Sequence, residues 1–322
     1  MCFAHSKRTH FTVMRRNFQP SFCRSARKHH LSLLYTMRYT LILKALTILF
    51  CSPLSASNLW KEDNIAKQIQ KITDDKEIVW LETDDRQPTL ALYKEPVITD
   101  IKGATIILHD IGHQPNWSQV IAPLRMQLPQ NGWHTLSVQM PIPDRLWQFN
   151  SPEDIYSASI NRLQAAITYL QTKNIKNLIL IAQGDSAALA SHYLSSSQHP
   201  FSAFVAISIT HGADASDWRN ISQSMKSLNL ATLDIYAEHD RPNVLNSIPL
   251  RLAAARLFGD KMQKIPPIPH SKKVRELAKN KTNNLWFRQI MIPNAAPGFP
   301  DHQKSFVKFV RGWLKHYTQP PP

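Results

Sequence analysis

Side chains that could act as nucleophile, acid and base occur in this sequence directly after short apolar runs. Ser186 follows LILIAQGD, Asp240 follows LDIYAEH, and His302 comes shortly after WFRQIMIP. A serine, a carboxylate and an imidazole in one site perform nucleophilic acyl transfer, because the imidazole takes the serine proton and the carboxylate orients the imidazole. The first chemistry to consider is therefore hydrolysis of an ester or amide.

Apolar runs alternate along the chain with amphipathic stretches, which is typical of a mainly parallel sheet covered by helices on both faces. The ends of such strands gather ligand-binding residues at one edge of the sheet. We predict strands at 77–83, 89–94, 104–110, 133–141, 177–182, 204–209, 231–240 and 286–293, the first two as a hairpin. We predict helices at 59–72, 117–128, 152–172, 186–194, 250–258 and 304–316.

The order of these elements and of their terminal residues resembles the α/β-hydrolase fold, in which nucleophile, acid and histidine follow one another along the chain. The stretches GATIILHDIGHQPNWSQVIAPLRMQLPQNGWHTLSVQMP and VRGWL further resemble an uncharacterised, exported, hydrolase-like family of Gram-negative bacteria. The resemblance extends over roughly residues 76–317. It implies one α/β-hydrolase-like domain over 58–317, with Ser186, Asp240 and His302 in the catalytic positions.

The sequence departs from the family's nucleophile motif, G-x-S-x-G. In one registration Ala182 and Ser186 take the glycine positions, so that Gly184 takes the place of the nucleophile and no nucleophile is present. A shift by two residues makes Ser186 the nucleophile and puts Ala188 at the last glycine. In neither registration is Asp185 the nucleophile, and we expect its carboxylate to cap the following helix.

Other ionisable residues near these positions have competing interpretations. Asp110 follows an early strand where this fold often has glycine, and its carboxylate would oppose a developing oxyanion. Glu238 is an alternative acid, and Asp240 is alternatively the start of a turn. His109 and His113 invite a metal site, but Gly112 between them argues against the helix that two such ligands require. We therefore expect His109 to pack beneath the site and no metal to bind.

Composition excludes several classes of protein. Only eight glycines occur, and neither G-x-G-x-x-G nor G-x-x-x-x-G-K-[ST] is present, so we expect no nucleotide cofactor. The formal charge of +15 would suggest nucleic acid, but nine basic residues and no acid fall within residues 1–56. The rest of the chain has 29 basic and 23 acidic residues, and we expect no nucleic-acid partner.

The N-terminal 56 residues have the features of a leader. Residues 37–56 combine a basic start, an uncharged apolar stretch and small residues before Ser57, which predicts a signal peptide cleaved near Ala56. Its apolar stretch is too short to span a bilayer, so no membrane anchor is expected after cleavage. We interpret residues 1–36 as a non-native extension of the reading frame, with translation starting at Met37; an organellar transit peptide is the alternative.

Export predicts a periplasmic or secreted protein. All three cysteines lie within the first 56 residues, so the remainder forms no disulfide. The basic, proline-containing segment 259–284 interrupts the strand and helix pattern and is expected to be a solvated insertion, with a lid or a lipid-facing surface as the alternative. Two functions remain open: a serine-type ester or amide hydrolase, or a non-catalytic module that binds a small-molecule or lipid-like ligand in a cleft with a degenerate nucleophile elbow.

Overall fold

The computed structural model describes residues 58–83, 88–143, 152–212, 217–254 and 287–316. Contact clustering places all of them in one compact unit, Leu54–Pro322. The predicted extension, the signal peptide and the whole 259–284 insertion lie outside the described residues. No helix in the described part of the chain is long and apolar enough to cross a membrane.

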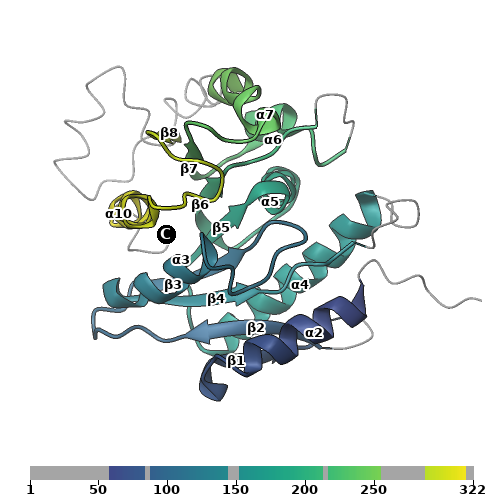
Figure 1. The fold of residues 1–322 in the computed structure, drawn as a ribbon, viewed down its shortest axis with the longest axis vertical. Helices are drawn as coiled ribbons and strands as arrows, with labels where there is room; N and C mark the ends of the chain where they lie inside the picture. Colours follow the sequence, from purple (N-terminus) through teal and green to yellow (C-terminus); the bar gives the residue numbers. More distant parts are fainter. Residues whose placement is uncertain (1–57, 84–87, 144–151, 213–216, 255–286, 317–322) are drawn as a thin grey trace, which may run out of the picture. The chain divides into compact units, whose positions relative to one another are not determined.

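One eight-stranded sheet forms the centre of the molecule (Figure 1). Its strands lie in the spatial order β1-β2-β4-β3-β5-β6-β7-β8. Their bounds are Ile78–Leu81, Thr89–Lys94, Gly103–Leu108, Trp133–Val138, Leu178–Gln183, Phe201–Ile207, Ala231–Ala237 and Phe287–Ile292, in order from β1 to β8. β2 runs antiparallel to both of its neighbours, and every other pair beyond it is parallel. The mainly parallel sheet predicted from the sequence is confirmed.

Helices cover both faces of this sheet, as buried parallel strands require. The helices α4 (Pro152–Thr172), α5 (Gly184–Ser196) and α6 (Ile221–Ser227) contribute to one core cluster. The helices α3 (Ile121–Gln127) and α10 (Gln303–Leu314) contribute to a second cluster, on the other face of the central strands (Figure 1). The four-residue helix α7 (Pro242–Leu245) follows β7.

The N-terminal helix α2 (Leu59–Gln70) packs separately, over the antiparallel end of the sheet. The side chain of Asn58 caps it by accepting a hydrogen bond from the Lys61 N–H at 3.0 Å. Ala66 and Ile69 pack against Leu90 and Leu92 of β2. The first described helix of the chain is therefore part of the fold.

The predicted elements agree with the structure most closely at one strand and at the longest predicted helix. β2 and α4 have the predicted bounds. The predicted helix 117–128 is shorter, since α3 begins at Ile121 after the turns that contain Pro115. The sequence analysis missed α6 and α7, because seven and four residues are too few to display a helical period.

Candidate functional site

The junction of β5 and α5 is where an α/β-hydrolase fold carries its nucleophile. β5 ends at Gln183 and α5 begins at Gly184 with no intervening loop. Gly184 has φ +61°, the left-handed conformation that glycine adopts without steric cost. Of the two registrations, this geometry places Gly184 at the tip of the turn and Ser186 two residues into the helix.

Ser186 is completely buried in the first turn of α5. Its Oγ has no hydrogen-bond partner among the described residues. A serine nucleophile needs contact with both a base and its substrate. The structure therefore gives this hydroxyl neither of the contacts that would activate it.

The carboxylate of Asp110 occupies the space beside the elbow. Its Oδ1 accepts hydrogen bonds from the backbone N–H of Asp185, at 2.7 Å, and of Ile111, at 3.0 Å. In this fold the oxyanion hole is built from the N–H of the residue after the nucleophile and an N–H from the loop after β3. Asp185 and Ile111 hold those two positions here, so a carboxylate oxygen lies where an oxyanion would bind.

A side chain at the elbow and the Asp110 carboxylate exclude each other. An ideal Cβ added to Gly184 would lie 2.1 Å from both Cγ and Oδ1 of Asp110. No real Cβ approaches a neighbour so closely, because the atoms would overlap. The glycine and the aspartate, 74 residues apart in the chain, form one packing unit.

Arg241 neutralises this carboxylate. Its Nη1 donates to Asp110 Oδ2 at 3.0 Å, and about 40% of the arginine side chain is exposed to solvent. Burial raises the pKa of the Asp110 carboxyl, and the nearby Asp185 raises it further. The charge of Arg241 and the Asp185 N–H oppose that rise, and so favour the ionised form.

Asp240, the predicted acid, lies buried in the turn after β7. Its Oδ2 accepts hydrogen bonds from Ser208 Oγ at 2.5 Å and from the Ala237 N–H at 3.1 Å. Its Oδ1 accepts from the Arg241 N–H at 2.9 Å. These contacts fit the turn-forming interpretation of Asp240, and its position after β7 is also that of the family acid.

His302, the predicted base, lies at the start of α10. Its Nδ1 is 3.0 Å from the Pro300 carbonyl oxygen, which can only accept, so Nδ1 carries the proton. No hydrogen bond or ion pair between described residues joins His302 to Ser186 or to Asp240. Ser186 lies in the first turn of α5, Asp240 in the turn after β7, and His302 at the start of α10, and no contact among the described residues connects them into a triad.

Comparisons with known proteins identify the family and the fold. The model of one family, described as "Protein of unknown function (DUF3530)", matches residues 53–159 and 149–266. The chain belongs to this family. The sequence comparison with curated proteins gave no match.

Solved structures similar to this family member are esterases and related hydrolases. The chain is 10% identical to Est1E from Butyrivibrio proteoclasticus, with a TM-score of 0.50, covering 75% of this chain and 98% of that chain. The esterase domain of a Rhodothermus marinus protein gives 12% identity and a TM-score of 0.52, covering 75% and 99%. Dienelactone hydrolase from Anabaena variabilis gives 14% and 0.51, covering 75% and 97%. At these identities the likeness establishes the α/β-hydrolase fold alone.

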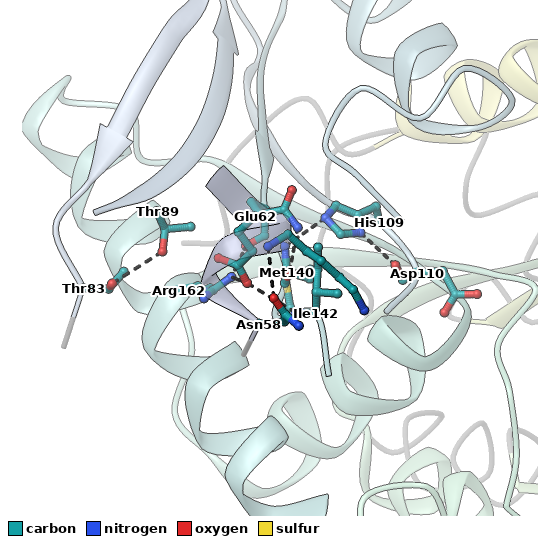
Figure 2. A network of polar contacts seen from close by, with 11 residues as sticks. Asn58, Glu62, Thr83, Thr89, His109, Asp110, Met140, Ile142 and Arg162 are labelled. Atoms are coloured by element: carbon teal, nitrogen blue, oxygen red, sulfur yellow. Dashed lines mark hydrogen bonds and ion pairs between the residues drawn. The ribbon is translucent and has the colours of Figure 1, made fainter. Parts of the chain in front are cut away.

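His109 is a structural residue of the same region (Figure 2). Its Nδ1–H donates to the Asp110 carbonyl at 2.8 Å, and its Nε2 accepts from the Met140 N–H at 2.9 Å. Burial lowers the pKa of His109 to about 3, so the ring is neutral at ordinary pH. The imidazole ties the end of β3 to the segment that follows β4, and thereby holds the Asp110 backbone in place.

The two-histidine motif does not assemble a metal site in the described part of the chain. Among those residues no group of three potential ligands comes together. His113 instead stacks on Trp117, with ring centroids 4.2 Å apart and an interplanar angle of 12°. Burial lowers the pKa of His113 as well.

An open groove, which we call the α2 groove, lies beside the β5–α5 junction and has a volume of about 670 Å³. α2 forms one wall, and the other wall comes from Ile111, Gly112, Ile142, Pro143 and Asp185. The α2 side contributes Trp60, Lys61, Asn64, Ile65 and Gln68. Two residues of the opposite wall, Ile111 and Asp185, also supply the N–H groups that bind Asp110.

Sequence reasoning missed the partners of Asp110 and the part played by α2. Arg241 is separated from Asp110 by 131 residues, and no local pattern predicts their pairing. A carboxylate in place of the usual glycine of the loop after β3 was the available signal. No sequence signal indicated the α2 groove, because α2 has the pattern of an ordinary amphipathic helix.

Proposed function

We propose that this chain is an exported α/β-hydrolase-fold protein that binds a ligand and does not hydrolyse it. The main observation in support is that Asp110 Oδ1 accepts hydrogen bonds from both N–H groups of the expected oxyanion hole. A tetrahedral intermediate needs those donors for its developing charge, and each donor contributes a large part of the rate in such enzymes. A fixed carboxylate there repels an oxyanion and blocks its position.

Two further observations support the proposal. Gly184 at the strand–helix junction has no side chain to attack a substrate. Ser186 is completely buried and without a hydrogen-bond partner among the described residues. The alternative function, a serine-type ester or amide hydrolase using Ser186, Asp240 and His302, is supported by chain order and fold, and it requires the start of α5 to rearrange.

A fluorophosphonate probe separates the two functions, because only an activated nucleophile reacts readily with it. We expect no covalent adduct by mass spectrometry on folded full-length protein, under conditions that label a known serine esterase completely. An adduct that disappears in both Ser186→Ala and His302→Ala would establish the hydrolase instead.

Export is part of the same proposal and rests on the leader sequence of residues 37–56. N-terminal sequencing of the protein recovered from the periplasm or medium tests it. We expect a start near Ser57. A start upstream of Met37 would contradict both the signal peptide and the assigned translation start.

A further inference from the structure

We propose that the α2 groove is a binding site for a neutral oligosaccharide. This inference rests on the proposed function and names the ligand class of the binding module. Its basis is the set of side chains that line the groove and the regular spacing of those on α2.

Three of these side chains form a row along one face of the helix. Trp60, Asn64 and Gln68 are four residues apart, so they recur about once per turn, at intervals of roughly 6 Å along the helix axis. The Trp60 side chain is 74% exposed, with its indole available to a ligand. Glu62, Ala66 and Ile69, on the other face of α2, are buried in the fold.

The chemistry of this row matches a sugar ring. The flat apolar surface of an indole packs against the C–H groups of a pyranose, as it does against other apolar surfaces. Each carboxamide offers both donors and acceptors, and each sugar hydroxyl needs both. Asn64 and Gln68 therefore suit hydroxyl groups better than they suit a group that only accepts or only donates.

The opposite wall adds a fixed acceptor. Asp185 Oδ1 accepts a hydrogen bond from Thr210 Oγ1, which orients the carboxylate. The structure gives its Oδ2 no hydrogen-bond partner within the described residues. Since Asp185 lines the groove, this oxygen is available to a ligand hydroxyl.

The charges and the surroundings of the groove exclude other ligand classes. Its lining residues include one cation, Lys61, and one anion, Asp185, so it has no net charge to attract an anionic or cationic polymer. β1 and β8 are the edge strands, and neither lines the groove, so an extended peptide has no strand edge to pair with.

Isothermal titration of the full-length protein with cellohexaose, chitohexaose and maltohexaose tests the proposal. We expect at least one of the three to bind, and Trp60→Ala to weaken that binding at least about tenfold. Asn64→Ala should weaken it by a smaller factor. Trp80→Ala is the matched control, because Trp80 is also exposed, at 46%, but lines a separate groove between β1 and α4. The affinity of this variant for the sugar should stay within about twofold of wild type.

Three results would overturn the proposal. One is the absence of binding by all three sugars at millimolar concentration, and another is binding that survives Trp60→Ala. The third is binding of polygalacturonate alone, abolished by salt, which would identify an anionic ligand. These results differ from those that would contradict the proposed function. If the protein is a hydrolase after all, the fluorophosphonate probe labels it, or the mass spectrum of the titrated sample contains cleaved sugar.

Discussion

At the scale of single residues, the candidate site is organised around one carboxylate. Asp110 accepts the two N–H groups of the expected oxyanion hole, pairs with Arg241 and fills the space over Gly184. A buried carboxylate is stable only with such compensation, because its desolvation is otherwise unfavourable by several kcal/mol. The Asp185 and Ile111 N–H groups and the Arg241 guanidinium together provide this compensation for Asp110.

Gly184 and Asp110 should show strongly coupled effects on stability. Gly184→Ala should lower the free energy of unfolding by about 2–4 kcal/mol in the wild type, through overlap with Asp110 and the positive φ. In an Asp110→Gly background the overlap is removed, and the same change should lower it by only about 1–2 kcal/mol. Urea denaturation of the four proteins measures the coupling.

Gly312→Ala is the matched control for this cycle. Gly312 lies inside α10, and nothing lies within 4 Å of a Cβ added there. Alanine should therefore stabilise the protein by up to about 1 kcal/mol. Equal effects of Gly184→Ala in both backgrounds would contradict the packing argument.

His109 should make stability depend on pH. Its pKa is about 3 in the folded protein and about 6.5 when unfolded, so the unfolded chain alone binds a proton between these values. Its contribution is fully present above pH 6.5 and is lost as the pH falls towards 3. Between pH 7 and pH 5 the wild type should lose about 2 kcal/mol more than His109→Gln, measured by urea denaturation at each pH.

The comparison of wild type with His109→Gln removes the effect of the other buried histidines on the pH dependence of stability. Burial also lowers the pKa values of His113, His134 and His199, and these residues are present in both proteins. Parallel pH profiles for wild type and His109→Gln would show that the ring titrates normally.

At the scale of secondary-structure elements, α2 is held in place by a buried ion pair. Glu62 Oε1 lies 3.0 Å from Arg162 Nη1 of α4, and it also accepts from the Ile142 N–H at 3.3 Å (Figure 2). Arg162 also donates to the Gln139 carbonyl at the end of β4. The same contacts thus anchor one wall of the α2 groove to the ends of the strands.

Replacing one partner of this ion pair should destabilise the protein much more than replacing both partners. Arg162→Met leaves the Glu62 charge buried, and should lower the free energy of unfolding by about 3–5 kcal/mol. The double variant Glu62→Leu/Arg162→Met should be clearly more stable than Arg162→Met, because no buried charge remains. Urea denaturation and hydrogen exchange of the α2 amides measure both effects.

Asp63 on the same helix provides the control for the ion-pair experiment. Its Oδ2 lies 2.6 Å from Lys67 Nζ, and both side chains are largely exposed. Asp63→Asn should therefore change stability by less than about 0.5 kcal/mol. A similar loss in Asp63→Asn and Arg162→Met would contradict a special role for the buried pair.

At the scale of the whole molecule, α2 and its cap Asn58 are the first part of the chain that the structure describes. One compact unit spans Leu54–Pro322. The two large core clusters are built by strands and helices that follow α2, while α2 covers Leu90 and Leu92 in a third. Removal of residues 1–56 should therefore leave the described fold intact, and removal of α2 should not.

Two truncations test this expectation. A chain of residues 57–322 should unfold in one cooperative transition, because every described element is retained. A chain that starts at Lys71 exposes Leu90 and Leu92 and lacks Glu62, the partner of Arg162 in the buried ion pair, so its stability should fall by at least about 3 kcal/mol. Thermal and urea unfolding measure both; equal stability of the two chains would show that α2 does not belong to the cooperative unit.

Local pattern alone was enough to predict the fold class. The continuous apolar runs of β3, β5, β6 and β7, the period of α4 and the short connections together imply a parallel sheet covered on both faces. The chemistry-bearing residues were also predicted to follow the strands, because strand ends are marked by the change from apolar to polar residues. What these local signals cannot specify is distance between segments that are far apart in the chain.

The state of the site was decided by such distances. The sequence left two registrations of the elbow open, and the positive φ of Gly184 together with its contact with Asp110 favours the one without a nucleophile. Nothing local distinguishes an Asp110 that faces solvent from one that accepts the Asp185 N–H and pairs with Arg241. A sequence pattern depends on neighbours along the chain. The hydrogen bonds and steric contacts of this site instead depend on the segments of Asp110, Gly184 and Arg241, which come together only when the chain folds.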